Sequence, residues 1–155
     1  MTMIGIVKAV CTSEKKGTVK KNVGKAVFLE NHGLVGDAHA GTWHRQVSLL
    51  SWEKIEAFKA LGVSVDDGDF GENLVVSGVD FARLPLGSIF QIGDAKLVLT
   101  QIGKECHHGC AIAQAVGKCI MPTEGVFAKV IKGGKVKVGD RMEVITEDEH
   151  EADTL

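Results

Sequence analysis

Short apolar runs separated by glycine are the feature that most constrains how this chain folds. The 155 residues include 19 glycines but only 2 prolines, and many of the glycines fall between runs rich in Val, Ile, Leu and Phe. This rhythm is typical of β-strands joined by tight turns, because glycine adopts backbone conformations that other residues resist. The sequence predicts eight strands, over residues 4–11, 26–29, 46–50, 74–76, 88–92, 96–101, 126–131 and 141–145.

Turn signals and helix signals fill the gaps between these strands. Gly93-Asp94 predicts a hairpin turn, and residues 132–135 predict a second hairpin. A helix is expected from Trp52 to about Leu61, capped by Ser51 and ended by Gly62. Its apolar face would be formed by Trp52, Ile55, Phe58 and Leu61. A second short helix is predicted over residues 110–116.

A mainly β chain exposes unpaired strand edges unless the sheet closes on itself. We therefore predict a mainly β fold, a closed or partly open barrel with one or two short inserted helices. The length suits one domain, assigned to residues 1–145.

The formal charge of −2 hides an uneven distribution. Five of the twenty acidic residues and none of the eighteen basic ones lie in residues 146–155, so residues 1–145 carry +3. We expect the acidic tail to be disordered. The balance excludes a nucleic-acid binder with a strong basic field, but a small anionic ligand remains compatible with it.

Localisation follows from what the sequence lacks. No apolar run reaches the length of a membrane span, and the first residues do not resemble a secretory signal. We expect a cytoplasmic protein with no membrane partner. Its four cysteines, Cys11, Cys106, Cys110 and Cys119, would then be thiols or metal ligands rather than disulfides. Cys11 lies in an apolar strand and is expected to fill space in the core.

Reactive side chains are densest in residues 104–110. Cys106 is the candidate nucleophile or soft-metal ligand, and cations at Lys104, His107 and His108 would favour its thiolate form. A structural zinc site is the rival interpretation, because Cys106, Cys110, Cys119 and His107 together offer four nitrogen and sulfur ligands.

Two further segments carry polar residues between glycines. In residues 33–46, Arg45 could bind a phosphate or another oxyanion, and His39 and His44 could add donors. A solvated polar turn is the alternative. In residues 68–73, Asn73 offers both a donor and an acceptor, or simply completes a glycine turn. The lysines at positions 15, 16, 20, 21 and 25 indicate a solvated loop or an anion-attracting rim.

Sequence motifs for nucleotide hydrolysis and for triad hydrolysis are absent. The segments that are present resemble, in their order, the MOSC domain family, named for the C-terminal domain of molybdenum cofactor sulfurases. The matching pieces are GLVGDAHAG (33–41), RQVSLL (45–50), GDFGENL (68–74), LPLGSIFQIGDAKLVLTQ (84–101), GKEC (103–106) and GVFAKVIKGGKVKVGD (125–140).

The resemblance implies a β-barrel that binds the molybdenum–pterin cofactor or handles sulfur for it. It implies that Cys106 ligates molybdenum or carries a persulfide, which suits a soft thiolate. The cofactor's phosphate and polar edges would be held by Arg45, His39, Asn73, Lys104 and Gln101. The segment 106–122 is similar to a subgroup associated with molybdenum cofactor biosynthesis.

This chain differs from other family members, and the difference limits which cofactors and partners we expect. The chain has no room for the pyridoxal-phosphate domain of the sulfurases, so we expect no pyridoxal phosphate and a separate sulfur donor, such as a cysteine desulfurase. The receiving partner would be a molybdoenzyme or a cofactor-biosynthesis protein. The alternative function is a non-catalytic accessory domain that binds zinc, another metal or molybdate through the Cys/His cluster.

Overall fold

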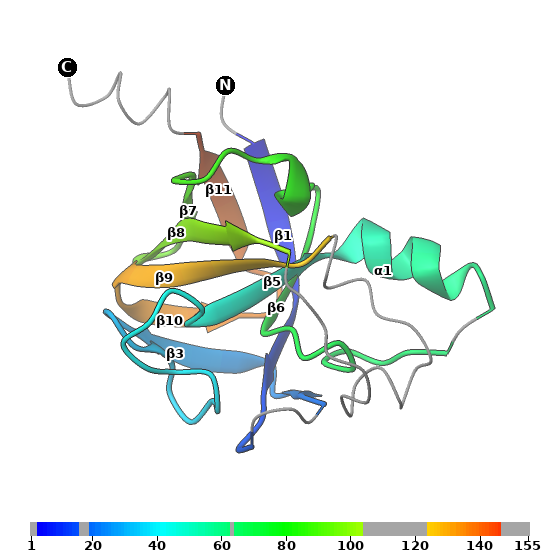
Figure 1. Ribbon diagram of the computed structural model, residues 1–155, viewed down its shortest axis with the longest axis horizontal. Helices are drawn as coiled ribbons and strands as arrows, with labels where there is room; N and C mark the ends of the chain where they lie inside the picture. Colours follow the sequence, from blue (N-terminus) through cyan, green and yellow to red (C-terminus); the bar gives the residue numbers. More distant parts are fainter. Residues whose placement is uncertain (1–2, 16–18, 63, 104–123, 147–155) are drawn as a thin grey trace.

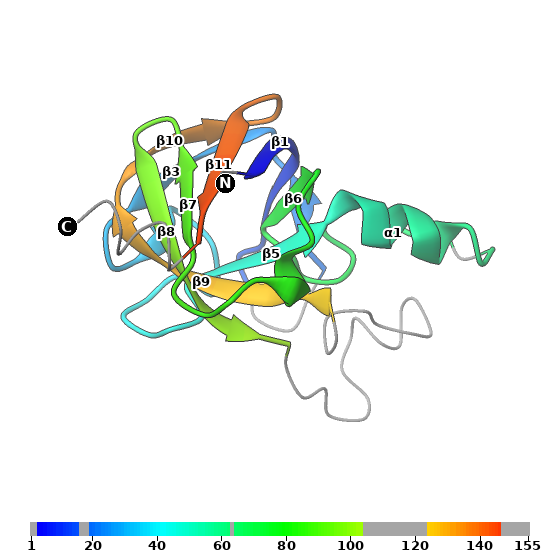
Figure 2. The same ribbon diagram turned by 90° about the horizontal axis from the view of Figure 1, so that it is seen from above.

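Seven strands form a closed β-barrel in the computed structural model, which describes residues 3–15, 19–62, 64–103 and 124–146. Figure 2 looks down on this ring of strands. Around the ring the order is β1 (Met3–Thr12), β6 (Leu74–Ser77), β5 (Val47–Ser51), β9 (Val126–Lys132), β8 (Ala95–Ile102), β7 (Ile89–Ile92) and β11 (Arg141–Ile145). The predicted mainly β barrel is confirmed, in its closed form.

The two ends of the described chain close the ring. Strand β1 pairs antiparallel with β11, from Met3 opposite Val144 to Ile6 opposite Arg141. Most neighbouring strands are antiparallel, but β5 and β6 are parallel. Their connection contains the helix α1 (Trp52–Lys59), as a crossover between parallel strands requires a longer segment than a hairpin does.

A smaller sheet of three strands lies against the barrel, below β9 in Figure 1. Its order is β10 (Gly134–Lys137), β3 (Lys25–Leu29) and β4 (Gly33–Leu34), and the short strand β2 (Lys21–Asn22) pairs with the end of β1. The predicted hairpin at residues 132–135 is wrong, because β10 pairs with β3 and not with β9. A Cβ on Gly133 would lie 2.7 Å from the Phe28 carbonyl oxygen, so these glycines permit a close crossing rather than a two-strand turn.

Apolar side chains fill two cores, one inside the barrel and one beneath the helix. The barrel interior is filled from every strand of the ring and includes Leu49, Phe90 and Leu97. The second core includes Leu50, Ile55 and Phe58, and it lies between α1 and the outer surface of the barrel. Strand β5 is buried along its whole length because it contributes to both cores.

The observed helix α1 matches the helix predicted from the sequence only in part. Ile55 and Phe58 are buried as predicted, but Leu61 lies beyond the end of the helix and is 71% exposed. Gly62 has a φ of +92°, which suits the predicted stop. Ser51 precedes the helix without capping it through its side chain; its hydroxyl donates instead to the Val79 carbonyl. A short 3-10 helix, η1, covers Phe81–Arg83.

All eight predicted strands are present, each with bounds within a residue or two of those expected. The hairpin at Gly93-Asp94 is also confirmed, since Ile92 pairs with Ala95 across it. The predicted helix at residues 110–116 and the tail from residue 147 onward lie outside the described residues. Within the described ranges, every helix falls short of the length and apolarity that a membrane crossing needs.

The barrel core predicts a strong dependence of stability on its packing. Leu97 is fully buried, and Leu97→Ala is expected to lower the free energy of unfolding by about 2–5 kcal/mol, measured by urea denaturation. The matched variant Leu86→Ala, at a side chain that is 54% exposed, should change it by about 0.5 kcal/mol or less. Equal effects of the two variants would contradict this description of the core.

Candidate functional site

A polar cluster gathers where β8 ends. The Gln101 side-chain oxygen accepts a hydrogen bond from Arg45 Nε at 3.0 Å and lies 2.8 Å from His44 Nε2. The Gln101 amide nitrogen donates to the Gly103 carbonyl oxygen at 2.8 Å, which fixes the orientation of the amide. Two residues that precede β5 are thereby joined to the end of β8.

Packing holds the Arg45 side chain in place. Its guanidinium carbon lies 5.2 Å from the centre of the Phe127 ring on β9, a cation–π distance. The Thr100 hydroxyl lies within hydrogen-bond distance of the carbonyl oxygens of His44 and Phe127. Among the described residues no carboxylate lies within 4 Å of Arg45. The cluster therefore presents a positioned cation that can receive an anion.

Aromatic contacts extend this cluster to His39. The His39 and Trp43 rings are stacked, with centroids 6.5 Å apart, and Trp43 meets His44 edge-on at 5.9 Å. The Trp43 indole N–H donates to the His39 carbonyl oxygen at 2.8 Å. We name this surface, formed by His39, Trp43, His44, Arg45 and Gln101, the Arg45 cluster. Trp43 was not among the residues predicted from the sequence; its signal was a large aromatic side chain in a loop rich in small and polar residues.

Asp37 organises the glycine-rich loop from within. Its carboxylate accepts hydrogen bonds from the backbone nitrogens of Ser13 and His39, each at 3.1 Å, and forms an ion pair with Lys20 at 2.8 Å. The side chains of Lys20 and Asp37 are fully buried. The expectation that Lys20 belongs to a solvated loop is therefore wrong, although Lys21 and Lys25 are exposed.

Asn73 lies inside the protein, where its side chain bonds to the backbone. Its side-chain oxygen accepts from the Ser48 backbone nitrogen at 2.9 Å, and its amide nitrogen donates to the Cys11 carbonyl oxygen at 3.0 Å. The residue is fully buried, so its carboxamide ties β5 and β1 to the start of β6. In this structure the Asn73 side chain therefore holds three strands of the scaffold together.

A buried carboxylate lies next to it in sequence. Glu72 accepts hydrogen bonds from the backbone nitrogens of Gly68 at 3.0 Å and Phe70 at 3.1 Å. Burial nevertheless raises the pKa of Glu72 to about 7. Cys11 is fully buried, as expected, and burial, followed by the charge of Glu72, raises the pKa of its thiol far above the usual value. Cys11 is thus a packing residue and not a reactive thiol.

The predicted residues Lys104, Cys106, His107, Cys110 and Cys119 lie outside the described residues. In the part of the chain that the structure describes, no group of three or more His, Cys, Asp or Glu side chains is arranged to hold a metal ion. Of the candidate cofactor-binding residues that are described, Arg45 and Gln101 are in direct contact, and His39 is linked to them through the rings of Trp43 and His44. Asn73 bonds instead to the backbone of Ser48 and Cys11.

The barrel, its small accessory sheet and its polar rim define a class of β-domain. Comparison of the sequence with models of protein families identifies the family. A model of the MOSC domain matches residues 36–143, and the chain belongs to this family. A search of curated proteins found no match.

Solved structures share the fold. The chain is similar to the YuaD protein of Bacillus subtilis, with a TM-score of 0.78 and 23% identity, covering 94% of this chain and 98% of that one. It also resembles YiiM from Escherichia coli, with a TM-score of 0.61 and 22% identity, covering 96% of this chain and 75% of that one. YiiM from Geobacillus stearothermophilus gives a TM-score of 0.63 at 17% identity, covering 91% of this chain and 73% of that one.

The buried ion pair predicts a difference between two neighbouring lysines. Lys20→Met leaves the Asp37 carboxylate buried without its cation and should lower the free energy of unfolding by about 3–5 kcal/mol in urea denaturation. The control Lys21→Met, at an exposed position, should change it by about 0.5 kcal/mol or less. A Lys20→Met variant as stable as the control would show that the ion pair does not stabilise the loop.

Glu72 predicts a pH dependence of stability. Because its folded-state pKa is about 7 against the usual 4.5, the folded chain binds the proton more tightly than the unfolded chain. Its contribution to stability is therefore full below about pH 4.5 and is lost as the pH rises to about 7. Across that window Glu72→Gln should reduce the fall in the free energy of unfolding by about 1–3 kcal/mol.

Urea denaturation at a series of pH values measures this effect. Glu56→Gln, which removes a carboxylate that is 40% exposed on α1, makes the same change in charge and is the control against which the Glu72→Gln profile is compared. Parallel profiles for the native chain and Glu72→Gln would contradict the prediction.

Proposed function

We propose that this chain handles the molybdenum–pterin cofactor or the sulfur supplied to it, with Cys106 as the sulfur- or metal-binding group. Membership of the MOSC family supports this class of function. The observation that carries the proposal is the Arg45 cluster, because it presents a fixed cation and polar donors next to the segment that contains the cysteine.

Chain connectivity links Cys106 to this cluster. Gln101 binds Arg45 directly and also binds the carbonyl of Gly103, the last described residue before the cysteine segment. Cys106 is three residues beyond Gly103 in the sequence. This short separation in sequence is our reason for assigning Cys106 to the same site as Arg45.

The hydrogen-bond donors among the described residues suit part of the molybdenum–pterin cofactor, namely its anionic groups. Arg45 has no carboxylate partner among the described residues, so its guanidinium can donate hydrogen bonds to the cofactor's phosphate or another oxyanion. His44 is exposed and His39 is half-buried, and both can add hydrogen bonds to such a ligand. When bound, the cofactor would supply oxygen-atom or sulfur chemistry at molybdenum. The chain would supply the anion-binding groups, and we assign Lys104 to the same role.

In the sulfur-carrier role, Cys106 receives sulfur from a persulfide on a donor protein such as a cysteine desulfurase. The Cys106 thiolate attacks the outer sulfur of the donor persulfide, so that a new S–S bond forms and the donor's S–S bond breaks. The donor leaves as a thiolate, and neither an oxidant nor a reductant is consumed. A molybdoenzyme or cofactor-biosynthesis protein would then take the sulfur. A reduced compartment such as the cytoplasm keeps the thiol available.

Anaerobic native mass spectrometry tests the role of Cys106. After incubation with a cysteine desulfurase and cysteine, the native chain should gain the mass of one sulfur atom, or should already carry a bound pterin. Cys106→Ala should show neither. Identical spectra for the two proteins, without added sulfur or pterin, would refute the proposal. Stoichiometric zinc that is lost in Cys110→Ser and Cys119→Ser would instead support a metal-binding accessory domain.

Arg45→Met tests the anion-binding role of the cluster. Methionine keeps the apolar contact with Phe127 but removes the charge, so the dissociation constant for the molybdenum–pterin cofactor should rise about 10- to 100-fold. Arg83→Met, at an arginine that is 63% exposed on η1, is the control and should leave the constant unchanged. A loss of affinity shared by both variants would point to general charge rather than to this site.

A further inference from the structure

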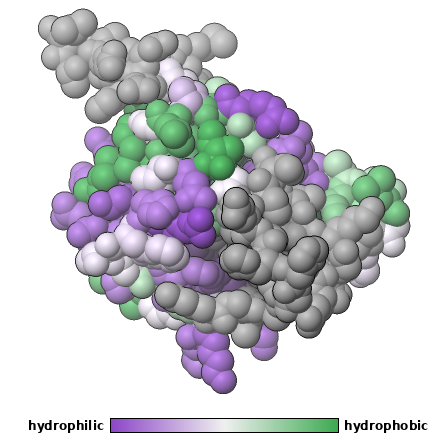
Figure 3. Space-filling model, viewed as in Figure 1, coloured by the Kyte–Doolittle hydropathy of each residue, from purple (hydrophilic) through white to green (hydrophobic). Residues whose placement is uncertain are grey.

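The outer face of the small sheet carries three lysines close together. Strands β3 and β10 pair so that Lys25 lies directly opposite Lys137 and Val27 lies directly opposite Lys135. Side chains alternate between the two faces of a strand, and these four residues are all exposed, whereas Phe28 and Val136 point into the barrel core. Figure 3 shows a surface of mixed hydropathy at the lower left, where β3 lies in Figure 1.

This arrangement is unfavourable for the sheet on its own. Like charges directly opposite each other on one face destabilise a strand pair. No carboxylate of the described residues lies within 4 Å of the ammonium groups of Lys25, Lys135 or Lys137. Asp140 is nearby, but its carboxylate accepts a hydrogen bond from the Lys137 backbone nitrogen at 2.9 Å and so closes the turn after β10. The three ammonium groups are therefore available to an external anion.

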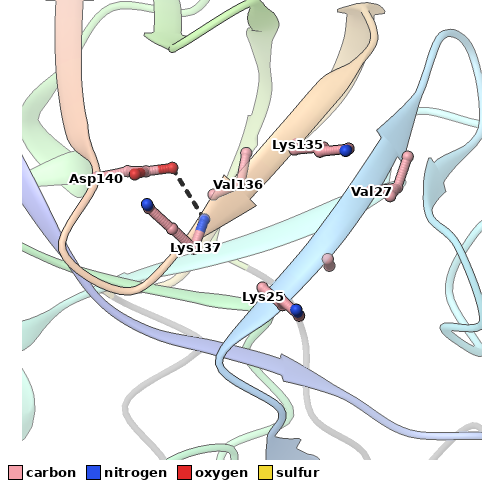
Figure 4. Close-up of a pocket in the computed structure, with 7 residues that line it drawn as sticks. Lys25, Val27, Lys135, Val136, Lys137 and Asp140 are labelled. Atoms are coloured by element: carbon pink, nitrogen blue, oxygen red, sulfur yellow. Dashed lines mark hydrogen bonds between the residues drawn. The ribbon is translucent and has the colours of Figure 1, made fainter.

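The lysines border a pocket large enough for a small molecule. Its volume is about 510 Å³, and its wall is formed by Lys25, Ala26, Val27, Lys135, Val136, Lys137 and Asp140. Figure 4 shows the lysines and Val27 along the two strands, with Asp140 at the turn. Ligand sites usually measure about 300–1,000 Å³ and combine apolar walls with a few charged groups. Three cations against one carboxylate give this pocket a formal charge of +2.

We propose that this pocket binds a small phosphorylated molecule that carries at least two negative charges. Lysine ammonium groups act as compact point charges, which suits the high charge density of phosphate groups. Lys25 and Lys137 face each other across the strand pair, and Lys135 precedes Lys137 by two residues on the same face of β10, about 7 Å along the backbone. Three lysines on one face can meet more than one phosphate group, while Val27 offers apolar contact to the organic part.

The site is separate from the one proposed above. It shares no residue with the Arg45 cluster, and its lysines lie on β3 and β10 rather than at the end of β8. Phosphate binding here therefore holds or fails independently of the role of Cys106.

Isothermal titration calorimetry of the full chain with inorganic pyrophosphate and with inorganic phosphate tests the proposal. Pyrophosphate should bind at one site and more tightly than phosphate. The double variant Lys25→Met/Lys137→Met should weaken pyrophosphate binding at least tenfold. Without ligand, the same variant should be at least as stable as the native chain, because the cross-strand repulsion is gone.

A matched control separates the pocket from general surface charge. Lys96 and Lys132 also face each other, on β8 and β9, but do not line the pocket. Lys96→Met/Lys132→Met makes the same change in net charge and should bind pyrophosphate like the native chain. Equal losses in both double variants, unchanged affinity in Lys25→Met/Lys137→Met, or no binding of pyrophosphate by the native chain would each overturn the proposal.

Discussion

Pairing between β1 and β11 is the interaction on which the rest of this structure depends. It joins the first and last described strands through four residue pairs and converts an open sheet into a ring. Closure removes both exposed edges of the sheet and encloses an interior that every strand of the ring helps to fill. Because the strands are then held on both sides, the loops at the rim of the barrel start and end at fixed positions.

Rim loops of this protein are held by buried polar groups rather than by regular structure. Asp37 anchors the glycine-rich loop through Lys20 and two backbone nitrogens, and Asn73 and Glu72 anchor the loop before β6 in the same manner. Buried polar groups are expensive to leave unpaired, so each of these residues ties its loop to one geometry. The Arg45 cluster and its attachment to Gln101 at the end of β8 rest on that rigidity, and the proposed function rests on the cluster.

The distribution of charge over the surface also bears on which ligands the protein can bind. The formal −2 of the whole chain conceals cations at two separate places, namely Arg45 at the rim and the lysines on β3 and β10. A modest positive field suits a small anion in a pocket, whereas a nucleic-acid duplex would call for many clustered contacts to phosphate. The two proposed ligands, a phosphate-bearing cofactor at the rim and a phosphorylated molecule on the small sheet, are both of the former kind.

Local signals in the sequence were sufficient for the strands, the turn at Gly93-Asp94 and the end of the helix at Gly62, because apolar runs and positive φ angles are properties of a few adjacent residues. They failed for β10, whose partner β3 is over a hundred residues away along the chain. They also failed to tell buried Lys20 from exposed Lys21, since only the contact with Asp37 distinguishes the two. Arg45 and Gln101 were both candidates, but their contact spans 56 residues. The seven strands of the barrel and β3 were thus determined by local sequence, whereas the short strands β2 and β4, the partner of β10 and the membership of each site were decided by the tertiary structure, because these contacts join residues that lie far apart along the chain.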